Sequence, residues 1–528
     1  RYQGVDSDPV NHGWLCDKGR FNFESVKNDQ RLTEPMVKHN GALVPTSWSS
    51  ALSTAAGLIS QAVKDNGAQS VAIIGGARGT NEDAYAWSLF AQALGVINVD
   101  AQLDDGLPAS VYGYSQATID QAANATTVIL LSPDLKEELP ILYLRLRDAS
   151  EKKRSKLIEF APKQTGITRY AWKSVAYEPG NQVAVVASTL ADATIAAQVA
   201  KGSVVVVVGR ANLAEDDSFT MAALDAVMAA APNATVLPVI RRGNVRGAIE
   251  TGLVTGSTTS ILRSAAAGKI NCLILLGADP IADVRDTELA RQAMAAVQHV
   301  IAIDTFASSS SQRADVLLPA AAFGEKDGTT TNLEGRVTQL NRKVNVHGTA
   351  RPDWMIALEL ADYLGHDLGV GSVQEVHQQL VNKVAAFGDA TRAALAVNPD
   401  GVLLRRSNGH SSAASSPAVP DRPGFGYRLV VSRKLYDNGS NVAHSASLAP
   451  LAPGSSLHMH PLDLDRLGAA VGAQVKVSSD RTSIVMPIVA DESVTRGTVW
   501  AAWAQSGANI GELIDSSRSV NDVKVETL

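Results

Sequence analysis

Short, fully apolar runs alternate with helix-like segments over roughly the first three quarters of the chain. Because these runs lack the polar alternation of half-exposed strands, they predict parallel strands covered on both faces by helices. Between them, apolar residues recur every three or four positions, first in a helix capped by Thr46 or Ser47. The pattern predicts strands at Val71–Ile74, Thr127–Leu131, Lys156–Phe160, Gln182–Val186, Ser203–Val208, Cys272–Leu276 and His299–Ile303, and helices near 81–94, 139–149, 189–200, 217–231, 286–297, 354–364 and 373–386.

The predicted strands are too numerous for one small sheet, so we expect two α/β domains. Residues 1–45 are polar and irregular. Residues 407–424 are rich in Ser, Ala and Pro, a composition typical of linkers. After this segment the pattern is entirely strand-like and predicts a small β-barrel. Its strands are expected at Tyr427–Tyr436, Gln474–Ser478, Ser483–Val489, Thr498–Trp503 and Val523–Glu526.

The composition of the chain excludes several classes of protein. The 528 residues include 47 Lys or Arg and 53 Asp or Glu, and this near-balance argues against a nucleic-acid binder. The basic cluster Glu151–Lys156 is interpreted as a solvated connection. Two cysteines exclude a disulfide framework and fit a reducing compartment. Since no apolar run approaches the length of a membrane span, we expect any membrane attachment to occur through protein partners.

Two glycine-containing loops that follow predicted strands are candidate binding loops. Gly75–Asn81 opens a helix, where backbone amides can approach a phosphate. Its spacing departs from G-x-G-x-x-G, and a tight turn capped by Thr80 or Asn81 is the favoured interpretation. Leu276–Pro280 also ends a strand, where open α/β sheets bind ligands, but a turn stopped by the proline is favoured there too.

No pattern indicates a catalytic residue. Gly113–Ala117 lacks the second glycine of a nucleophile elbow. His458 and His460 would share one strand face, but no further His or Cys lies nearby in the sequence, so a zinc site is disfavoured. Cys272 lies inside an apolar run and is expected to be a small buried residue.

Cys16 has a different setting, beside Lys18, Gly19 and Arg20. Cations lower the pKa of a thiol, and glycine permits close approach of a bulky anionic group. A [4Fe–4S] cluster needs four thiolates, and this chain has only two cysteines. On the residues alone a free thiol is therefore favoured, and Cys16 becomes a metal ligand only if a preceding segment supplies the others.

Several stretches together resemble the molybdopterin oxidoreductase superfamily. More narrowly, they resemble the large iron–sulfur subunit of bacterial respiratory complex I, the NADH–quinone oxidoreductase. The resemblance covers essentially the whole chain and is weakest around the predicted linker. It rests on Leu15–Phe21, Arg31–Met36, Gly75–Glu82, Glu137–Arg147, Arg242–Asn244, Leu276–Pro280, Ala314–Pro319, Glu325–Thr329, Asn332–Val337 and Leu457–Pro461.

The resemblance implies two doubly wound α/β domains, one nested in the other, followed by a C-terminal β-barrel. Cys16 matches the family's fourth ligand to a [4Fe–4S] cluster; the other ligands would precede Arg1, and Lys18 and Arg20 would help offset the cluster's charge. The implied domains are 1–45 (the end of an iron–sulfur domain), 46–102 plus 249–406 (split α/β), 103–248 (nested α/β), 407–424 (linker) and 425–528 (barrel).

The resemblance also implies that no molybdopterin is bound. Catalytic relatives hold molybdenum through a Cys, a selenocysteine or another metal-binding side chain after the first βα unit. The corresponding region, Asp100–Tyr114, contains no cysteine, although Ser110 or an aspartate could in principle be a ligand.

The leading hypothesis is a non-catalytic scaffold and electron-transfer subunit of the peripheral arm of complex I, which passes electrons from NADH to quinone. Its implied partners are the NADH-binding flavoprotein, a small iron–sulfur subunit and the subunits leading to quinone. The implied location is the cytoplasmic face of the bacterial inner membrane. The alternative hypothesis is an active molybdenum or tungsten oxidoreductase that resembles formate dehydrogenase, and a generic α/β enzyme is a remote third.

Overall fold

The computed structural model describes residues 2–405, 417–424 and 426–528, so most of the predicted linker at 407–424 lies outside the described residues. The chain divides into two compact units. Unit 1 comprises Arg1–Ser25, Asp105–Ile240 and Asn408–Leu528, and unit 2 comprises Val26–Asp104 and Arg241–Ser407. The five domain boundaries expected from the sequence stay a prediction.

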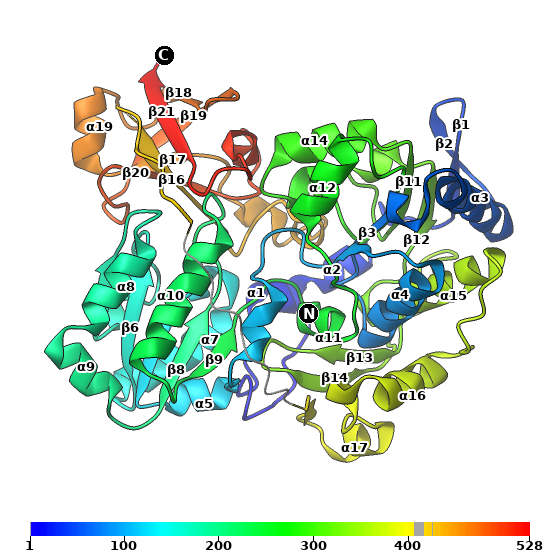
Figure 1. The fold of residues 1–528 in the computed structure, drawn as a ribbon, viewed down its shortest axis with the longest axis horizontal. Coiled ribbons are helices and arrows are strands. Elements are labelled where there is room, and N and C mark those ends of the chain that lie inside the picture. The colour runs from blue at the N-terminus through cyan, green and yellow to red at the C-terminus, as the bar shows by residue number, and fades with distance from the viewer. Residues whose placement is uncertain (1, 406–416, 425) are drawn as a thin grey trace. The chain divides into compact units, whose positions relative to one another are not determined.

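Unit 2 is built on a seven-stranded sheet of order β2-β1-β12-β11-β10-β3-β4 (Figure 1). The strands from β12 to β4 are parallel, and the hairpin β1–β2 adds two antiparallel strands at one edge. A small antiparallel sheet, β13-β14-β15, completes the unit. The elements are β1 (Met36–His39), β2 (Ala42–Pro45), α3 (Trp48–Asn66), β3 (Val71–Gly75), α4 (Asn81–Leu94), β4 (Asn98–Asp100), α11 (Val245–Glu250), α12 (Thr258–Ala266), β10 (Cys272–Leu276), α13 (Pro280–Asp283), α14 (Thr287–Ala296), β11 (His299–Asp304), β12 (Val316–Pro319), β13 (Gly328–Thr331), β14 (Arg336–Leu340), α15 (Asp353–Tyr363), α16 (Val373–Lys383), α17 (Arg392–Val397) and β15 (Val402–Leu403).

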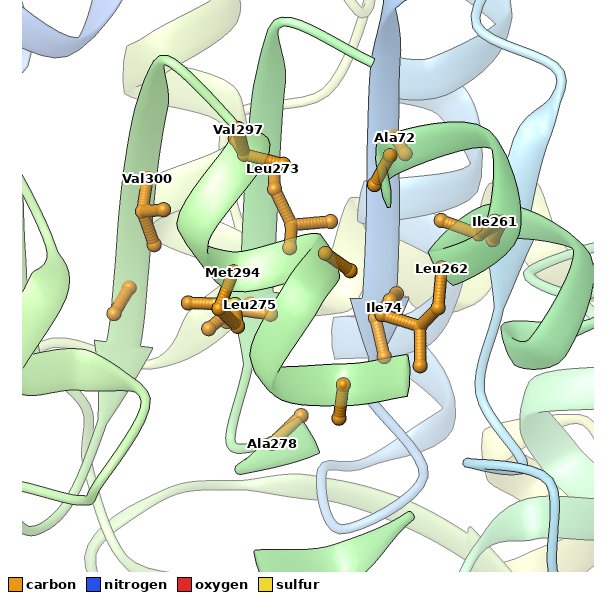
Figure 2. Packing of buried hydrophobic residues seen from close by; sticks show 14 of the residues in the cluster. Ala72, Ile74, Ile261, Leu262, Leu273, Leu275, Ala278, Met294, Val297 and Val300 are labelled. Atoms are coloured by element: carbon orange, nitrogen blue, oxygen red, sulfur yellow. The ribbon is translucent and has the colours of Figure 1, made fainter. Parts of the chain in front are cut away.

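Helices α12 and α14 cover one face of the seven-stranded sheet. Alternate residues of the central strands point to this face, as the twofold period of a strand requires, and they pack against the apolar stripes of the two helices (Figure 2). Burial of these side chains stabilises the sheet by roughly 1.5–3 kcal/mol for each large residue. The cluster includes Ala72, Ile74, Leu273, Leu275 and Val300 of the strands, Ile261 and Leu262 of α12, and Met294 of α14.

The first turn of α4 is polar yet buried, and it ties the helix to distant segments of unit 2. Thr80 caps the helix: Thr80 Oγ1 accepts from Asp83 N at 3.0 Å, and Asp83 Oδ2 accepts from Thr80 N at 2.8 Å. Glu82 accepts from Thr329 N at 2.7 Å, and its carboxylate lies 2.8 Å from His377 Nδ1. These hydrogen bonds fix the end of the glycine-containing loop Gly75–Asn81, one of the two candidate binding loops expected from the sequence.

Asp83 also belongs to a buried ion-pair triad. Lys326 Nζ lies 2.7 Å from Asp83 Oδ2 and 2.7 Å from Asp353 Oδ2, and the lysine side chain is 5% exposed. Burial alone would lower the pKa of Lys326, but the two carboxylates outweigh burial and raise it. Burial raises the pKa of Asp353, against the pull of Lys326. One ammonium therefore balances two buried carboxylates.

Unit 1 contains a five-stranded parallel sheet of order β7-β6-β5-β8-β9 and a closed six-stranded barrel of order β16-β20-β17-β19-β18-β21. Helices α8 and α10 pack side by side on the sheet (Figure 1). The elements are α1 (Asp17–Phe21), α5 (Ile119–Asn124), β5 (Thr127–Leu131), α6 (Leu135–Glu138), α7 (Pro140–Glu151), β6 (Lys156–Ala161), β7 (Lys173–Ala176), α8 (Gln182–Leu190), α9 (Ala193–Val199), β8 (Val204–Val208), α10 (Asp217–Ala230), β9 (Thr235–Pro238), β16 (Tyr427–Ser432), α18 (Ser440–Ala443), β17 (Leu457–Met459), α19 (Pro461–Leu467), β18 (Gln474–Ser478), β19 (Ser483–Ala490), β20 (Thr498–Ala502) and β21 (Asp522–Thr527). Helix α2 (Phe23–Val26) lies at the boundary of the two units.

The fold class expected from the sequence is confirmed: parallel α/β sheets and a C-terminal barrel. The strand expected at Gln182–Val186 is wrong, because these residues begin helix α8. Gln182, Val186 and Leu190 are the buried residues of α8, at the four-residue spacing of a helix, and the connection from β7 to the parallel sheet needs a crossover.

The segment expected to be irregular, residues 1–45, contains the hairpin β1–β2. The C-terminal segment is not entirely strand-like, because it contains helix α19, which begins at a proline. Among the residues that the structure describes, no single helix has both the length and the apolar composition to cross a membrane. The pair α8 and α9, bent by 83°, meets those criteria only when the two are taken together.

Candidate functional site

The five-stranded sheet of unit 1 has a topological switch point between β5 and β8. From β5 the chain continues to β6 and β7 on one side, and it then returns to β8 and β9 on the other. The loops that follow β5 and β8 consequently diverge at the carboxyl edge of the sheet, which is where open α/β sheets bind ligands. Gly209, after β8, allows tight packing there: an added Cβ would lie 2.7 Å from Val239 O and 3.0 Å from Pro133 Cδ.

The barrel forms the second wall of this crevice, also within unit 1. Leu213 N donates to Val431 O at 2.8 Å, and Val431 N donates to Asn212 Oδ1 at 2.9 Å, so the loop after β8 is bonded to β16. On the other side, Gln164 N donates to Ser493 O at 2.9 Å, which joins the loop after β6 to the barrel. Backbone hydrogen bonds therefore fix both sides of the crevice.

A narrow pocket, partly open to solvent, remains between the strand ends and the barrel; the roughly 380 Å³ of space that it spans includes open solvent. Its wall combines charged side chains with one tryptophan. The lining residues are Ser132, Asp134, Glu137, Ala161, Pro162, Lys163, Thr165, Ala211, Ser432, Arg433, Lys434 and Trp500. We refer to this space as the strand-end pocket.

Lys163 is the cation of the strand-end pocket that is available to a ligand. Its Nζ donates to Gln164 O at 3.0 Å and lies 4.8 Å from the centre of the Trp500 ring. Burial lowers the pKa of this half-buried ammonium. Among the described residues no carboxylate lies within ion-pairing distance of it. By contrast, Arg433 is bound to buried Asp105 at 2.6 Å and Lys434 to Glu137 at 2.7 Å.

Two carboxylates and a tryptophan complete the strand-end pocket. Asp134 accepts from Lys136 N at 3.0 Å and from Gly166 N at 3.1 Å, and burial raises its pKa. Burial also acts to raise the pKa of Glu137, but the hydrogen bonds from Lys434 and from Leu435 N, together with the neighbouring lysine charges, outweigh it and lower the pKa. Trp500 is 6% exposed. The arrangement offers one unpaired cation, two acceptors and an aromatic edge, a set suited to a nucleotide.

The seven-stranded sheet of unit 2 has a comparable switch point between β3 and β10. The favoured interpretation of the loop after β3 is confirmed, because Thr80 caps α4. Gly75 allows β3 and β10 to approach closely at this edge, because its φ is +107° and an added Cβ would lie 2.2 Å from Leu276 O. In the loop after β10, Asp279 accepts from Ser309 N and Ser310 N at 3.0 and 3.1 Å.

A buried carboxyl at the end of β11 lies at this same sheet edge. Burial raises the pKa of Asp304 to about 6, against the opposing charge of Arg78. Arg78 itself pairs with Asp283 at 3.1 Å. The carboxyl edge of this sheet therefore carries both acidic and basic groups beside its two glycine-containing loops.

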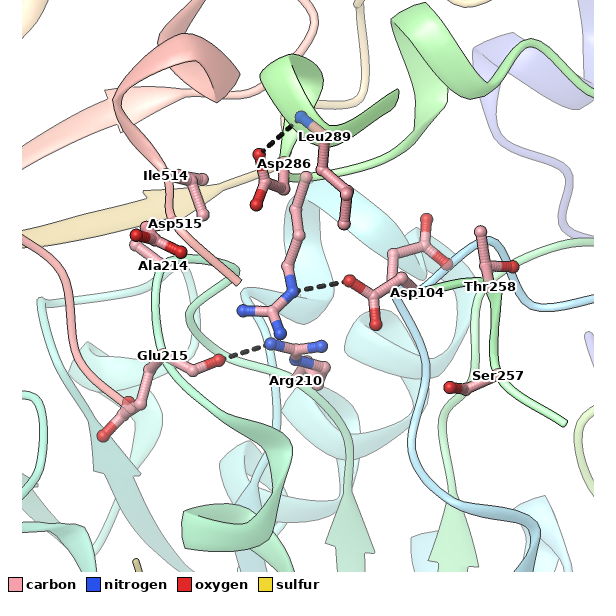
Figure 3. A network of polar contacts seen from close by, with 12 residues as sticks. Asp104, Arg210, Ala214, Glu215, Ser257, Thr258, Asp286, Leu289, Ile514 and Asp515 are labelled. Carbon is pink, nitrogen blue, oxygen red and sulfur yellow. Dashed lines mark hydrogen bonds and ion pairs between the residues drawn. The ribbon is translucent and has the colours of Figure 1, made fainter. Parts of the chain in front are cut away.

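The aspartates in Asp100–Tyr114 are occupied by protein contacts. Asp100 accepts from Thr258 N at 2.8 Å, and burial raises its pKa. Within unit 2, Arg285 Nε lies 2.7 Å from Asp104 Oδ2 (Figure 3). Ser110 is exposed, in unit 1. Asp100 and Asp104 therefore have partners within the protein.

The histidines considered from the sequence have structural roles. His458 Nδ1 lies 2.9 Å from Asp491 Oδ2, and His460 Nδ1 accepts from Leu462 N at the start of α19. No group of three or more metal-ligating side chains occurs among the described residues. Cys272 is fully buried, as expected, and burial raises its pKa to about 12.

Cys16 lies at the N-cap of α1 and is half-buried. Lys18 Nζ lies 3.6 Å from Asp437 Oδ1, so its charge is partly balanced by protein. Arg20 Nη2 approaches Leu15 O at 3.5 Å. The role of Cys16 as a cluster ligand stays a prediction.

A buried glutamate in the loop after β8 makes the stability of unit 1 depend on pH. Gly180 N donates to Glu215 Oε1 at 2.5 Å, and Arg210 donates to Glu215 O (Figure 3). Burial raises the pKa of Glu215 to about 7. The native carboxyl thus holds its proton where the unfolded one, with a pKa near 4.5, has lost it.

This raised pKa predicts a loss of stability as the pH rises from about 5 to 8. At about 1.4 kcal/mol for each unit of pKa shift, the loss has an upper bound of about 3.5 kcal/mol. Glu215→Gln keeps an acceptor for Gly180 N and removes the titration. We expect scanning calorimetry to show a shallower fall of Tm with pH in this variant, by a few degrees over the window. Parallel profiles for the two proteins would contradict the assignment.

Together the switch points and the strand-end pocket define an α/β protein whose sheets have crevices at the carboxyl ends of their strands, where open α/β sheets bind ligands. The family model "Molybdopterin oxidoreductase" matches residues 31–363, and "Molydopterin dinucleotide binding domain" matches residues 427–525. The chain therefore belongs to the molybdopterin oxidoreductase family.

Named relatives span several activities. NADPH-Fe(3+) oxidoreductase subunit alpha of Geobacter sulfurreducens is 27% identical over 99% of this chain and 71% of its own length. A subunit of the NADH-quinone oxidoreductase of Mycobacterium tuberculosis is 27% identical over 96% of this chain and 65% of its own length. F420-dependent formate dehydrogenase 1 subunit alpha of Methanococcus maripaludis is 24% identical over 95% of this chain and 91% of its own length.

Acetylene hydratase from Pelobacter acetylenicus shares the fold. The TM-score is 0.72 at 13% sequence identity, over 99% of this chain and 96% of that one. The family expected from the sequence is thus confirmed at the level of the superfamily. The narrower resemblance to the large iron–sulfur subunit of complex I is not specific, because relatives with other activities are equally similar.

The expected absence of molybdopterin is wrong. Both family models describe pterin-binding proteins, and one of them covers the barrel. The expectation rested on the missing cysteine in Asp100–Tyr114 and on the narrower resemblance to the complex I subunit. The missing cysteine concerns a ligand of the metal, whereas the family model over residues 427–525 concerns the dinucleotide. The family points to a molybdenum- or tungsten-pterin cofactor.

Proposed function

We propose that this chain is the pterin-dinucleotide-binding subunit of a multi-subunit oxidoreductase that exchanges electrons with a nicotinamide-oxidising partner. One observation carries the proposal: the barrel wall of the strand-end pocket, Ser432–Lys434 and Trp500, falls within the range matched by the dinucleotide-binding family model. The barrel that the dinucleotide-binding model matches is therefore also the one that forms a wall of this pocket, which supports the proposal.

The donors present fit such a cofactor. The unpaired ammonium of Lys163 suits a phosphate oxygen. Asp134 retains acceptor capacity for the N–H groups of a base, since an ionised carboxylate can accept about four hydrogen bonds. When bound, the cofactor supplies the redox centre. The protein's own task in this pocket is to bind and orient the nucleotide.

The names of the relatives support a nicotinamide-linked partner. The Geobacter protein is named for NADPH and the Mycobacterium protein for NADH. In the second of these settings the chain would work in the peripheral arm of a complex I. Its partners there would be an NADH-binding flavoprotein, a small iron–sulfur subunit and the subunits leading to quinone, at the cytoplasmic face of a bacterial inner membrane.

The same proposal assigns Cys16 as one thiolate of a [4Fe–4S] cluster. Cys272 is buried in a core strand, so the remaining ligands must come from outside these 528 residues.

Purification of the native assembly tests the proposed function. We expect a tagged chain, isolated from gently solubilised membranes and from the soluble fraction, to co-purify with subunits that oxidise NADH or NADPH with an artificial acceptor. The isolated chain should lack this activity. Formate oxidation by the chain alone, with no dependence on nicotinamide nucleotides, would overturn the proposal in favour of the formate dehydrogenase alternative.

A further inference from the structure

The surface of unit 1 carries a local excess of positive charge. Residues 147–173 contain eight Lys or Arg and three Asp or Glu, in a chain whose formal net charge is −6. The buried carboxylate among the three, Glu159, is satisfied internally by the hydroxyls of Thr165, Thr168 and Ser174 at 2.5–2.7 Å. It therefore does not neutralise the surface.

Apart from Lys163, which lines the strand-end pocket, the cations of this surface fall into two groups, and Lys136 of α6 joins the second of them. Arg147 pairs with Glu151, and Asp148 pairs with both Lys152 and Arg154. In the part of the chain that the structure describes, no carboxylate lies within ion-pairing distance of the second group, whose members are all exposed. This group, the basic edge, consists of Lys136, Lys153, Lys156, Arg169 and Lys173.

Part of the basic edge lies on or next to an open strand: Lys173 is on β7, Arg169 shortly precedes it, and Lys156 begins the neighbouring strand β6. β7 is the terminal strand of the five-stranded sheet and is paired only with β6. Three of its four residues are exposed. An open edge presents unpaired backbone N–H and C=O groups, which can bind an added strand. Beside it, Trp172 is 39% exposed, with Lys156 Nζ 4.1 Å from its ring centre.

A hollow adjoins the same surface. It holds about 760 Å³ of open space and has Lys136 and Arg169 among its lining residues, with Thr165 and Thr168 between them. The two exposed cations suit the carboxylate of an acidic side chain. The hollow, the open strand and the basic edge lie within one unit.

We infer that the basic edge binds an extended acidic segment of a partner protein, which pairs with the free side of β7. The inference rests on the proposed function, because it requires a partner in the assembly. Nucleic acid fits less well, because a nucleic-acid strand cannot use the unpaired backbone groups of β7. The charge excess instead complements clustered carboxylates.

Fluorescence anisotropy with the whole chain tests the inference. The probe is a labelled peptide that alternates Glu and Val, and a Lys–Val peptide serves as the opposite-charge probe. We expect the acidic peptide alone to bind, and added salt to weaken the binding. The variant combining Lys156→Glu, Arg169→Glu and Lys173→Glu should weaken binding at least about tenfold, and Lys201→Glu, an exposed lysine elsewhere in unit 1, should not.

A second variant, Ala176→Pro, separates backbone pairing from charge. Tyr177 N donates to Ala161 O of β6 at 3.2 Å, and backbone groups alternate in direction along a strand, so Ala176 N faces the free side of β7. The proline removes this donor and leaves the charges intact, so it should weaken peptide binding if the strands pair. Circular dichroism verifies that the variant is folded. If the variant does not fold, a probe peptide with N-methylated backbone amides replaces it, because such a peptide cannot donate backbone hydrogen bonds to β7. Unchanged binding of the N-methylated peptide to the wild-type chain would contradict strand pairing.

Other outcomes would also overturn the inference. These are an equal loss of binding with Lys201→Glu, and tighter binding of duplex DNA than of the acidic peptide. Pterin content should be the same in all these variants, because none of the substituted residues lines the strand-end pocket. Failure of the inference is therefore distinguishable from failure of the proposed function.

Discussion

The variant Lys163→Glu is expected to lose most of its bound pterin. Lys163 is the unpaired cation of the strand-end pocket, and its backbone is held by a bridge to Val494 of the barrel. A charge-assisted hydrogen bond to a phosphate contributes about 1.5–3 kcal/mol, which corresponds to a change of about tenfold to a hundredfold in affinity. Reversal of the charge adds repulsion to this loss. The measurement is pterin fluorescence after oxidative extraction, per mole of purified chain.

Two controls make that result specific. Lys163→Arg keeps the charge and should retain most of the pterin, whereas Lys201→Glu makes the same charge change at an exposed position outside the pocket. If Lys163→Glu retained as much pterin as the wild type, with both proteins folded, the strand-end pocket would not be the phosphate-binding site.

Replacement of Lys326 by methionine should strongly destabilise unit 2. Removal of the ammonium leaves Asp83 and Asp353 facing each other in a buried setting. Breaking a buried ion pair in this way costs about 3–5 kcal/mol. Asp83 also caps α4, so the loop after β3 should loosen together with the helix. We expect calorimetry to show a lowered unfolding temperature for the transition of unit 2.

The matched control is Lys524→Met. Lys524 pairs with Glu526 at 2.7 Å on the barrel surface, where its side chain is 58% exposed. Exposed pairs contribute little to stability, so this variant should unfold like the wild type. Equal stability of Lys326→Met and Lys524→Met would show that the triad does not hold α4.

The fold was largely predictable because its central strands are fully apolar. β5 and β10 were predicted with their observed bounds, since no surface-facing residue interrupts them. The prediction of a strand at Gln182–Val186 was wrong because a short apolar run fits a buried strand and a buried helix equally well. The hairpin β1–β2 was missed because edge strands are short and partly polar.

The site was harder to predict from the sequence. The two loops selected for their glycines are turns that serve their own sheets, as Gly75 beside Leu276 O shows. Lys163 comes shortly after strand β6, and no glycine motif lies between them. The contact of its ammonium with Trp500 joins residues more than 300 positions apart in the sequence. Only the docking of the barrel on the five-stranded sheet makes that lysine half-buried and unpaired. The signal available in the sequence was a lysine directly after Ala161-Pro162 at a strand end.

Oxidative extraction of pterin from the purified wild-type assembly, together with elemental analysis, tests the central claim most directly. We expect about one pterin dinucleotide for each copy of this chain, with molybdenum or tungsten in a stoichiometric amount. An intact, folded assembly that contains this chain and yields no pterin would contradict it.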